Sequence, residues 1–154
     1  MTIRKAELYD LARIAEIEVF NYRLNFYHIF QNDYFYFQEM QVLNVINEDK
    51  RHLDQLWVYD DDGIIKAFMW VDAQQIKKLF VEPVLQSKGI GSVLLIYATT
   101  ELEATYLWAL EKNTSFNQFH EIVRSIFFEH SFFCRLKAVL FVKIDCSRIL
   151  FECP

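Results

Sequence analysis

Glycine and proline are scarce in this chain, and their positions limit the folds that it can adopt. The 154 residues include three Gly and two Pro, whereas average usage would give about 11 and about 8. Gly89, Gly91 and the one internal proline, Pro83, lie close together. A chain this sparing with glycine uses it where the backbone needs a conformation that other residues avoid. We therefore expect residues 81–92 to form a tight loop and to be the chief candidate for a functional site.

The N-terminal part of the sequence predicts an edge strand followed by helices. Residues 2–6 alternate briefly, as an edge strand does, and residues 8–20 carry apolar side chains at helical spacing with Glu16 and Glu18 on the polar face. Residues 20–43 are rich in aromatic side chains with mixed spacing. This segment predicts one or two helices with an irregular link, and we expect its rings to pack in the core.

A hairpin and a third strand follow. Residues 55–59 and 64–71 have strand composition, and three aspartates and Gly63 stand between them as a turn that places Gly63 at positive φ. The aspartates predict a solvated turn, because no further carboxylate follows at the spacing of a calcium loop. A third strand over residues 75–81 ends at Pro83, since proline cannot continue a ladder of hydrogen bonds.

The loop leads into an apolar helix and another strand. Residues 90–103 predict a helix buried against a sheet, and residues 106–110 predict a short apolar strand. Strand, helix and strand in this order imply a parallel crossover. The sequence therefore predicts an α/β (α+β) domain with a mixed, mostly antiparallel central sheet flanked by helices.

The C-terminal part has a different composition. A helix is predicted from residue 113 to about 123 and strands over 138–144 and 148–152, whereas residues 125–137 show no clear pattern. Residues 116–154 contain no Gly, eight of the 15 Phe and all three Cys. Exposed apolar surface in such a segment predicts a partner surface, a homodimer included, or a tendency to aggregate.

Charge and composition argue against several classes of protein. The net charge of −5 lacks the basic footprint of a nucleic-acid binder. No uncharged apolar stretch reaches the roughly 18 residues that a membrane span needs, and no secretory signal is visible. The three cysteines are odd in number and lack metal-finger spacing, so we expect free thiols, no metal and a cytoplasmic location.

The chemistry of residues 81–92 favours an anion. Consecutive backbone N–H groups at the start of a helix form a concave array of donors, and the helix dipole adds partial positive charge. Gly89 and Gly91 let the main chain approach oxygen atoms closely, and Lys88 adds a cation. A tight structural turn is the alternative reading, because the pattern is neither a P-loop nor the three-glycine dinucleotide fingerprint.

The surroundings of the glycines resemble a known family. Gln86, two residues, Gly89, one residue and Gly91, set between a strand and an apolar helix, resemble the acetyl-CoA loop of the GNAT superfamily of N-acetyltransferases. That signature is Gln or Arg, two residues, Gly, one residue, then Gly or Ala. Residues 79–83 are similar to the family's fourth strand and its exit, and residues 107–119 to its fifth strand and following helix. The resemblance covers about residues 1–120.

The resemblance implies a fold, a cosubstrate and a reaction. The fourth and fifth strands would splay apart around acetyl-CoA within a single domain of residues 1–154, and an amine would attack the thioester directly. The acceptor would be a primary amine of a small molecule or a peptide. The implied acetyl-CoA contacts are Leu79, Phe80 and Val81 for the pantetheine, Gln86, Ser87, Lys88, Gly89, Ile90, Gly91 and Ser92 for the pyrophosphate, and Asn113 and Phe119 beyond the fifth strand.

Departures from the family affect catalysis most. His120 stands where the family has a tyrosine that protonates the CoA thiolate; a histidine can donate this proton, or it is a helix histidine with no such role. Asn113 also fits a helix N-cap, and Phe116 replaces a small residue beside the cofactor. Residues 121–154 are atypical, either as a diverged closing hairpin or as an altered end such as a shifted reading frame would leave. The rival function is therefore a non-catalytic CoA-binding or oligomeric interaction protein.

No general base is identified by the sequence. Glu82 and Glu111 lie near the relevant strand ends, but both are interpreted as solvated surface residues. Tyr27 and His28, in the aromatic segment, are candidates for facing the acceptor by location only.

Overall fold

The computed structural model describes residues 1–110, 132–136 and 139–145. The chain divides into two compact units. Unit 1 comprises Met1–Trp70 and Lys78–Leu94, and unit 2 comprises Val71–Lys77 and Leu95–Pro154. Within the described ranges, every helix is too short or too polar to cross a membrane.

The strands of unit 1 form an antiparallel meander. They are β1 (Thr2–Lys5), β2 (Leu56–Asp61), β3 (Ile64–Asp72) and the end of β4 (Gln75–Val81), in the order β1-β2-β3-β4. β1 pairs with β2 and β2 with β3 in antiparallel register. All four strands stand where the sequence pattern predicts them.

The hairpin turn between β2 and β3 is shorter than the sequence suggests. Asp62 and Gly63 alone form it, with φ of 53° and 82°, which is the positive-φ pair that a two-residue hairpin needs. Asp60 and Asp61 belong to β2 instead. The Asp60 carboxylate accepts a 2.7 Å hydrogen bond from the Gly63 N–H, so this aspartate stabilises the turn from the strand.

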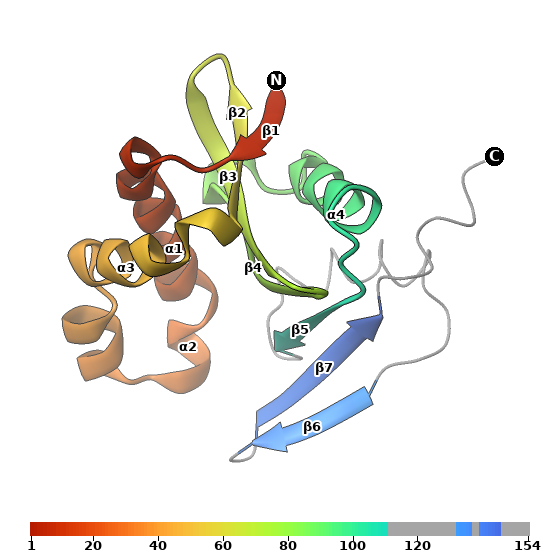
Figure 1. Ribbon diagram of the computed structural model, residues 1–154. Coiled ribbons are helices and arrows are strands. Elements are labelled where there is room, and N and C mark those ends of the chain that lie inside the picture. The colour runs from red at the N-terminus through yellow and green to blue at the C-terminus, as the bar shows by residue number, and fades with distance from the viewer. Residues whose placement is uncertain (111–131, 137–138, 146–154) are drawn as a thin grey trace. The chain divides into compact units, whose positions relative to one another are not determined.

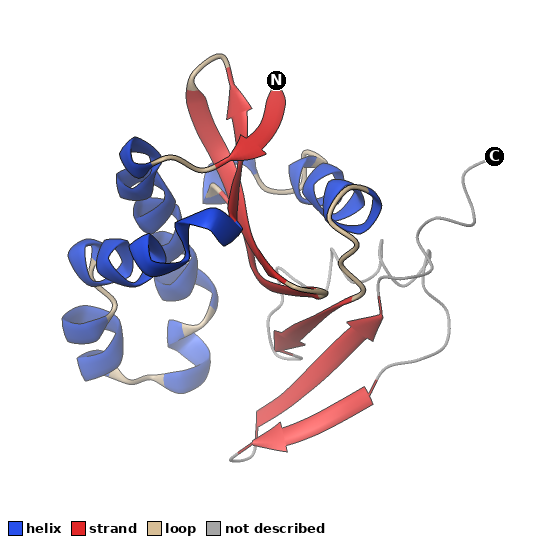
Figure 2. Ribbon diagram, viewed as in Figure 1, coloured by secondary structure: helices blue, strands red, loops and turns tan. Residues whose placement is uncertain are grey.

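Helices cover one face of the unit 1 strands (Figure 2). They are η1 (Leu8–Asp10), α1 (Leu11–Asn25), α2 (Tyr27–Phe30), η2 (Phe35–Glu39), α3 (Val42–Asp49) and η3 (Lys50–Gln55). α1 and α3 lie side by side (Figure 1). α1 continues five residues beyond the predicted end at residue 20, because Asn21 and Asn25 are buried within it and hydrogen-bonded.

The core of unit 1 lies between α1 and the sheet. Ile14 and Ile17 of α1 pack in one cluster with Leu56, Val58 and Phe68, and all five are fully buried. Burying an aliphatic side chain of this size stabilises a fold by roughly 1.5–3 kcal/mol. The predicted amphipathic stripe of α1 is thus confirmed, but Glu18 is not on an exposed polar face: only 2% of it is exposed.

A loop and a helix continue from β4. η4 (Pro83–Leu85) is followed by α4 (Ile90–Thr100), three residues shorter than predicted. Leu94 and Ala98 are buried, whereas Val93 is 44% exposed. The helix is apolar around most of its circumference near its start, yet Val93 and Ile96 remain exposed. After the end of α4, Glu103 adopts φ of 55°, and the Ala104 N–H donates a hydrogen bond to the Ala98 carbonyl.

Unit 2 contains a parallel pair and an antiparallel hairpin. The start of β4 pairs in parallel with β5 (Tyr106–Leu110), as predicted, and the order is β4-β5-β7-β6 with β6 (Phe132–Leu136) and β7 (Val139–Asp145) antiparallel. β7 matches the predicted strand over 138–144. β6 lies in the segment without a clear pattern. The predicted helix over 113–123 and strand over 148–152 lie outside the described residues. The mixed, mostly antiparallel sheet with flanking helices confirms the predicted fold class.

Candidate functional site

The loop between β4 and α4 has the backbone geometry of an anion site. Ser87 has φ of 62° and Gly89 has φ of 82°, so two of its residues are left-handed. Gly91 lies in the first turn of α4, where glycine is not needed for its φ. The sequence pattern therefore located the special backbone correctly at Gly89 but missed it at Ser87. A serine at positive φ is uncommon and marks a loop held in place by its surroundings.

Several N–H donors of this loop have no partner among the residues that the structure describes. The first main-chain bond of α4 runs from the Val93 N–H to the Gly89 carbonyl, at 3.0 Å. The N–H groups of residues 87–92 have no acceptor within the described part of the chain. The N–H of Gln86, by contrast, donates to the Pro83 carbonyl at 3.4 Å. A helix N-terminus with unpaired donors attracts an oxyanion by hydrogen bonding and by its dipole.

Space is open above Gly89. A Cβ placed on Gly89 would meet no heavy atom of the described residues within 4 Å. Ser87, Lys88 and Gly89 are exposed, so the donors face a region that a ligand can reach. Donors, cation and open space together fit a phosphate or a pyrophosphate.

The end of β4 is fastened to helix α1. The carbonyl of Val81 accepts hydrogen bonds from the Asn21 Nδ2 at 3.0 Å and from the Gln86 Nε2 at 3.3 Å. Gln86 also donates to the Asn21 Oδ1 at 2.8 Å. The side chain of Gln86 thus turns back onto α1, and only its main chain follows the loop. Phe80, the residue before Val81, packs against Tyr22 and Phe68, and its ring centroid lies 5.7 Å and 5.8 Å from theirs.

Glu82 is part of the same attachment. The Arg13 guanidinium forms an ion pair with the Glu82 carboxylate and donates to the Ile65 carbonyl at 3.2 Å. Only 14% of the Glu82 side chain is exposed. The interpretation of Glu82 as a solvated surface residue is therefore wrong, because Arg13 reaches it across the exit of β4.

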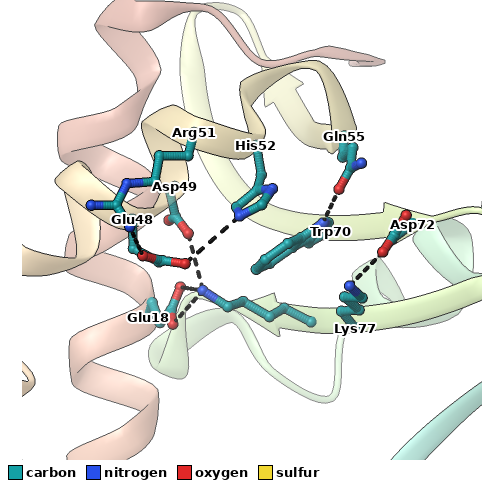
Figure 3. Close-up of polar contacts among 10 residues, drawn as sticks. Glu18, Glu48, Asp49, Arg51, His52, Gln55, Trp70, Asp72 and Lys77 are labelled. Carbon is teal, nitrogen blue, oxygen red and sulfur yellow. Dashed lines mark hydrogen bonds and ion pairs between the residues drawn. The ribbon is translucent and has the colours of Figure 1, made fainter.

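A buried charge cluster beside β4 was not found from the sequence. The Lys78 Nζ lies 2.7 Å from Glu18 of α1 and 3.0 Å from Asp49 of α3, and 5.1 Å from the ring centroid of Trp70. The His52 ring stacks on the Trp70 ring, with the two ring centroids 4.5 Å apart (Figure 3). Glu18 and Asp49 are 2% and 0% exposed. One signal was available: Lys78 stands between Ile76 and Phe80 at the inward-facing positions of an alternating strand.

The cluster contains more negative than positive charge. Two carboxylates share one ammonium group, and the buried Oδ2 of Asp49 has no hydrogen-bond partner among the described residues. Burial raises the pKa of Glu18 to about 7, against the attraction of Lys78 and with the repulsion of Asp49. Burial also raises the pKa of Asp49. Burial lowers the pKa of Lys78, but the two carboxylates outweigh it and leave that pKa raised. Glu18 therefore keeps its proton to a higher pH than an exposed glutamate does.

The raised pKa of Glu18 predicts a stability that falls with pH. The folded state binds the proton more tightly than the unfolded state, so this stabilisation is fully present below pH 4.5 and is lost as the pH rises through about 7. The shift corresponds to about 3 kcal/mol of unfolding free energy. Urea denaturation between pH 5 and pH 8 should show the decline in the parent protein, and Glu18→Gln should remove most of it. Glu16→Gln, at an exposed position of the same helix, is the control and should keep the slope. An unchanged slope in Glu18→Gln would contradict this assignment.

The candidates in the aromatic segment are engaged locally. The Tyr27 hydroxyl donates to Asp33 at 2.6 Å, and its ring packs on Tyr36. The side chain of His28 is exposed. Tyr36 is buried, whereas Phe37 is half exposed. Only some of the rings therefore pack in the core of unit 1, and the expectation that they all do is wrong.

The remaining predicted site residues lie outside the described residues. They are Asn113, Phe119 and His120, together with Glu111 and Phe116. Those that the structure does bring together are the residues of the loop and the end of β4, all in unit 1.

Comparison with known proteins finds likeness in structure only. No protein-family model and no curated protein matches the chain. Among solved structures, it is similar to the PaiA N-acetyltransferase of Thermoplasma acidophilum in complex with coenzyme A, with TM-score 0.68 and 16% identity over 94% of this chain and 98% of that one. YncA of Salmonella typhimurium, solved with acetyl-CoA, matches with TM-score 0.62 and 15% identity over 100% and 96% of the chains.

A third likeness names the family directly. A GNAT-family acetyltransferase of Bacillus cereus matches with TM-score 0.63 and 17% identity, over 94% of each chain. Identities this low carry the fold and nothing finer. The strand order of this chain, with a parallel β4–β5 pair and a glycine loop leading into α4, agrees with the resemblance that the sequence itself carries. The protein therefore has the fold of the GNAT N-acetyltransferases.

Proposed function

We propose that this protein is an N-acetyltransferase that moves an acetyl group from acetyl-CoA directly to a primary amine of a small molecule or a peptide. The observation that carries the proposal is the loop before α4. Within the described part of the chain, it combines N–H donors without an acceptor at residues 87–92 with open space above Gly89. Two of the structurally similar proteins were solved with coenzyme A or acetyl-CoA, which supports the choice of cosubstrate.

Each part of the loop region has a role in this proposal. The N–H groups of residues 87–92 bind the pyrophosphate, and Lys88 adds a positive charge. The pantetheine arm pairs with the main chain of residues 79–81 as an added strand would. Because the Val81 carbonyl already accepts two side-chain hydrogen bonds, this pairing falls to the other main-chain groups of that segment.

The reaction needs positioning and two proton movements. The neutral amine attacks the thioester carbonyl carbon, so a C–N bond forms and the C–S bond breaks. The nitrogen loses a proton to solvent water, and the CoA thiolate gains one. We assign the donor role to His120, whose unperturbed pKa near 6.5 suits proton transfer at neutral pH. Asn113 and Phe119 are proposed to contact the pantetheine.

Replacing His120 tests the proposed chemistry. With an accepting amine, His120→Phe should lower the rate of acetyl transfer by at least about 100-fold, because the thiolate then leaves without its proton donor. Release of the CoA thiol measures the rate, and calorimetry measures CoA binding, which should change little. Asn44→Ala, at an exposed position in α3 with no role in the proposed site, is the control and should keep full activity.

Outcomes with the parent protein separate the two candidate functions. Binding of CoA without turnover on a broad panel of amines would favour the non-catalytic CoA-binding protein. No binding of CoA or acetyl-CoA would contradict both functions. An active His120→Phe variant would be consistent with the enzyme function and would contradict only the role of His120 as proton donor.

A further inference from the structure

Two carboxamide side chains meet at the last residue of β4. The Val81 carbonyl accepts from the Asn21 Nδ2 at 3.0 Å and from the Gln86 Nε2 at 3.3 Å. Asn21 belongs to α1 and Gln86 to the loop, so residues that are 65 positions apart in the chain hold one carbonyl oxygen. A carbonyl oxygen has two lone pairs, and both are occupied here.

The direction of this carbonyl explains why it needs side-chain partners. The N–H of Glu82, in the same peptide unit, donates to the Lys66 carbonyl of β3 at 2.9 Å. In a trans peptide the C=O and the N–H point in opposite directions, and the described chain has no cis peptide bond. The Val81 carbonyl therefore points away from β3, toward the edge of β4 on which Gln75 and Ile76 pair with β5. The side chains replace a neighbouring strand at this point.

Asn21 uses its full hydrogen-bonding capacity there. Its Nδ2 donates to the Ile17 carbonyl at 2.8 Å as well as to Val81, and its Oδ1 accepts from Gln86 and from Asn25 at 2.8 Å and 3.1 Å. The side chain is 1% exposed. Only a carboxamide offers two donors and an acceptor in one plane at this length, so Asp, Leu or Ala in this place would leave buried groups unpaired.

We propose that Asn21 is a positioning residue for CoA: with Gln86 it holds the Val81 carbonyl and thereby sets both the end of β4 and the start of the glycine loop. This inference rests on the proposed function. In the proposed function, Asn21 does not contact the reacting atoms. It acts through Gln86 and Val81, which stand immediately before the main-chain donors at residues 87–92.

Calorimetric titration with coenzyme A tests the proposal without any acceptor or turnover. Asn21→Ala and Gln86→Ala should each weaken CoA binding by about tenfold or more, because each removes a donor to the Val81 carbonyl. Gln86→Arg should stay within about threefold of the parent protein, since a guanidinium supplies donors for both Asn21 and Val81. Gln86 itself is half-buried, so its variants should fold and remain informative if Asn21→Ala does not fold.

Two controls separate positioning from loss of stability. Val45→Ala removes buried volume in the separate cluster with Ala15 and Val19, and should lower stability while leaving CoA affinity within about twofold. Asn44→Ala removes an exposed asparagine whose amide donates to the Glu39 carbonyl, and should change neither. If Val45→Ala weakens CoA binding as much as Asn21→Ala does, general stability explains the effect and the proposal is overturned.

Non-additivity is the second readout. If Asn21 and Gln86 act as one unit, the double variant Asn21→Ala/Gln86→Ala should lose no more CoA affinity than the larger single loss. Losses that multiply would overturn the proposal.

Hydrogen exchange of the free protein distinguishes the failure of this proposal from that of the proposed function. The hydrogen-bonded amides that follow Val81, those of Glu82, Leu85 and Gln86, should exchange at least about tenfold faster in Asn21→Ala than in Val45→Ala. Equal exchange in the two variants would overturn the positioning role even if the parent protein binds CoA and transfers acetyl groups. A parent protein that binds no CoA would overturn the proposed function, and the role toward CoA with it.

Discussion

Lys78→Met is expected to lower the free energy of unfolding by about 3–5 kcal/mol at neutral pH, because it leaves two buried carboxylates without their counter-ion. Glu18 and Asp49 are 2% and 0% exposed, and Lys78 is the ammonium group that both contact. The loss should shrink toward pH 5, where the carboxylates are neutralised by protons instead. Urea denaturation at several pH values measures both effects.

The control and the rescue for this variant are available in the same chain. Lys77→Met, at the next position, removes an exposed lysine that pairs with Asp72, and it should change stability little. The triple variant Glu18→Gln/Asp49→Asn/Lys78→Met removes every charge of the cluster and should regain most of the lost stability. A Lys78→Met protein as stable as the parent, or a triple variant as unstable as Lys78→Met, would show that the cluster is not a coupled buried ion network.

Gly89→Val is expected to weaken CoA binding by well over tenfold, which is more than about 1.4 kcal/mol. Two causes act together. The φ of 82° at Gly89 is strained for a β-branched residue, and the new side chain would enter the open space in which the proposal places the pyrophosphate. Calorimetry with coenzyme A measures the affinity.

Gly63→Val is the matched control. Gly63 has the same φ of 82° and the same absence of heavy atoms within 4 Å of a built Cβ, but it lies in the β2–β3 hairpin. The backbone strain should cost both variants a similar amount of stability, roughly 1–3 kcal/mol. Gly63→Val should nevertheless bind CoA like the parent protein. Unchanged affinity in Gly89→Val would refute the placement of the cosubstrate, and equal losses in both variants would attribute the effect to instability.

Helix α1 connects the fold of unit 1 to its candidate site. Arg13, Glu18 and Asn21 of this one helix reach Glu82, Lys78 and the Val81 carbonyl respectively. The apolar side of the helix packs on β2 and β3, so the polar contacts are held at fixed positions by the core. Changes in α1 are therefore expected to affect the loop even though the helix contains no part of it.

Local patterns account for the features that were predicted well. A positive φ in a two-residue turn is restricted enough in residue type that Gly63 identifies the hairpin. Pro83 marks the end of β4 because it lacks an N–H, and the alternation and helical spacing of apolar residues show which element each segment forms. The loop at Gly89 was located for the same reason. β6 was missed because a short aromatic run without flanking turn residues has no distinctive local pattern.

The amino-acid sequence by itself determined the kinds of elements, their order and the place of the glycine loop, because these depend on dihedral preferences and periodicities within a few residues. Only the tertiary structure decided which polar residues are buried. Glu18, Asp49 and Lys78 look like surface residues in sequence, as do Arg13 and Glu82, and their burial and pairing depend on partners 29 to 69 positions away. The raised pKa of Glu18 and the capture of the Val81 carbonyl by Asn21 follow from those distant contacts, since desolvation and hydrogen-bond partners exist only once the chain has folded.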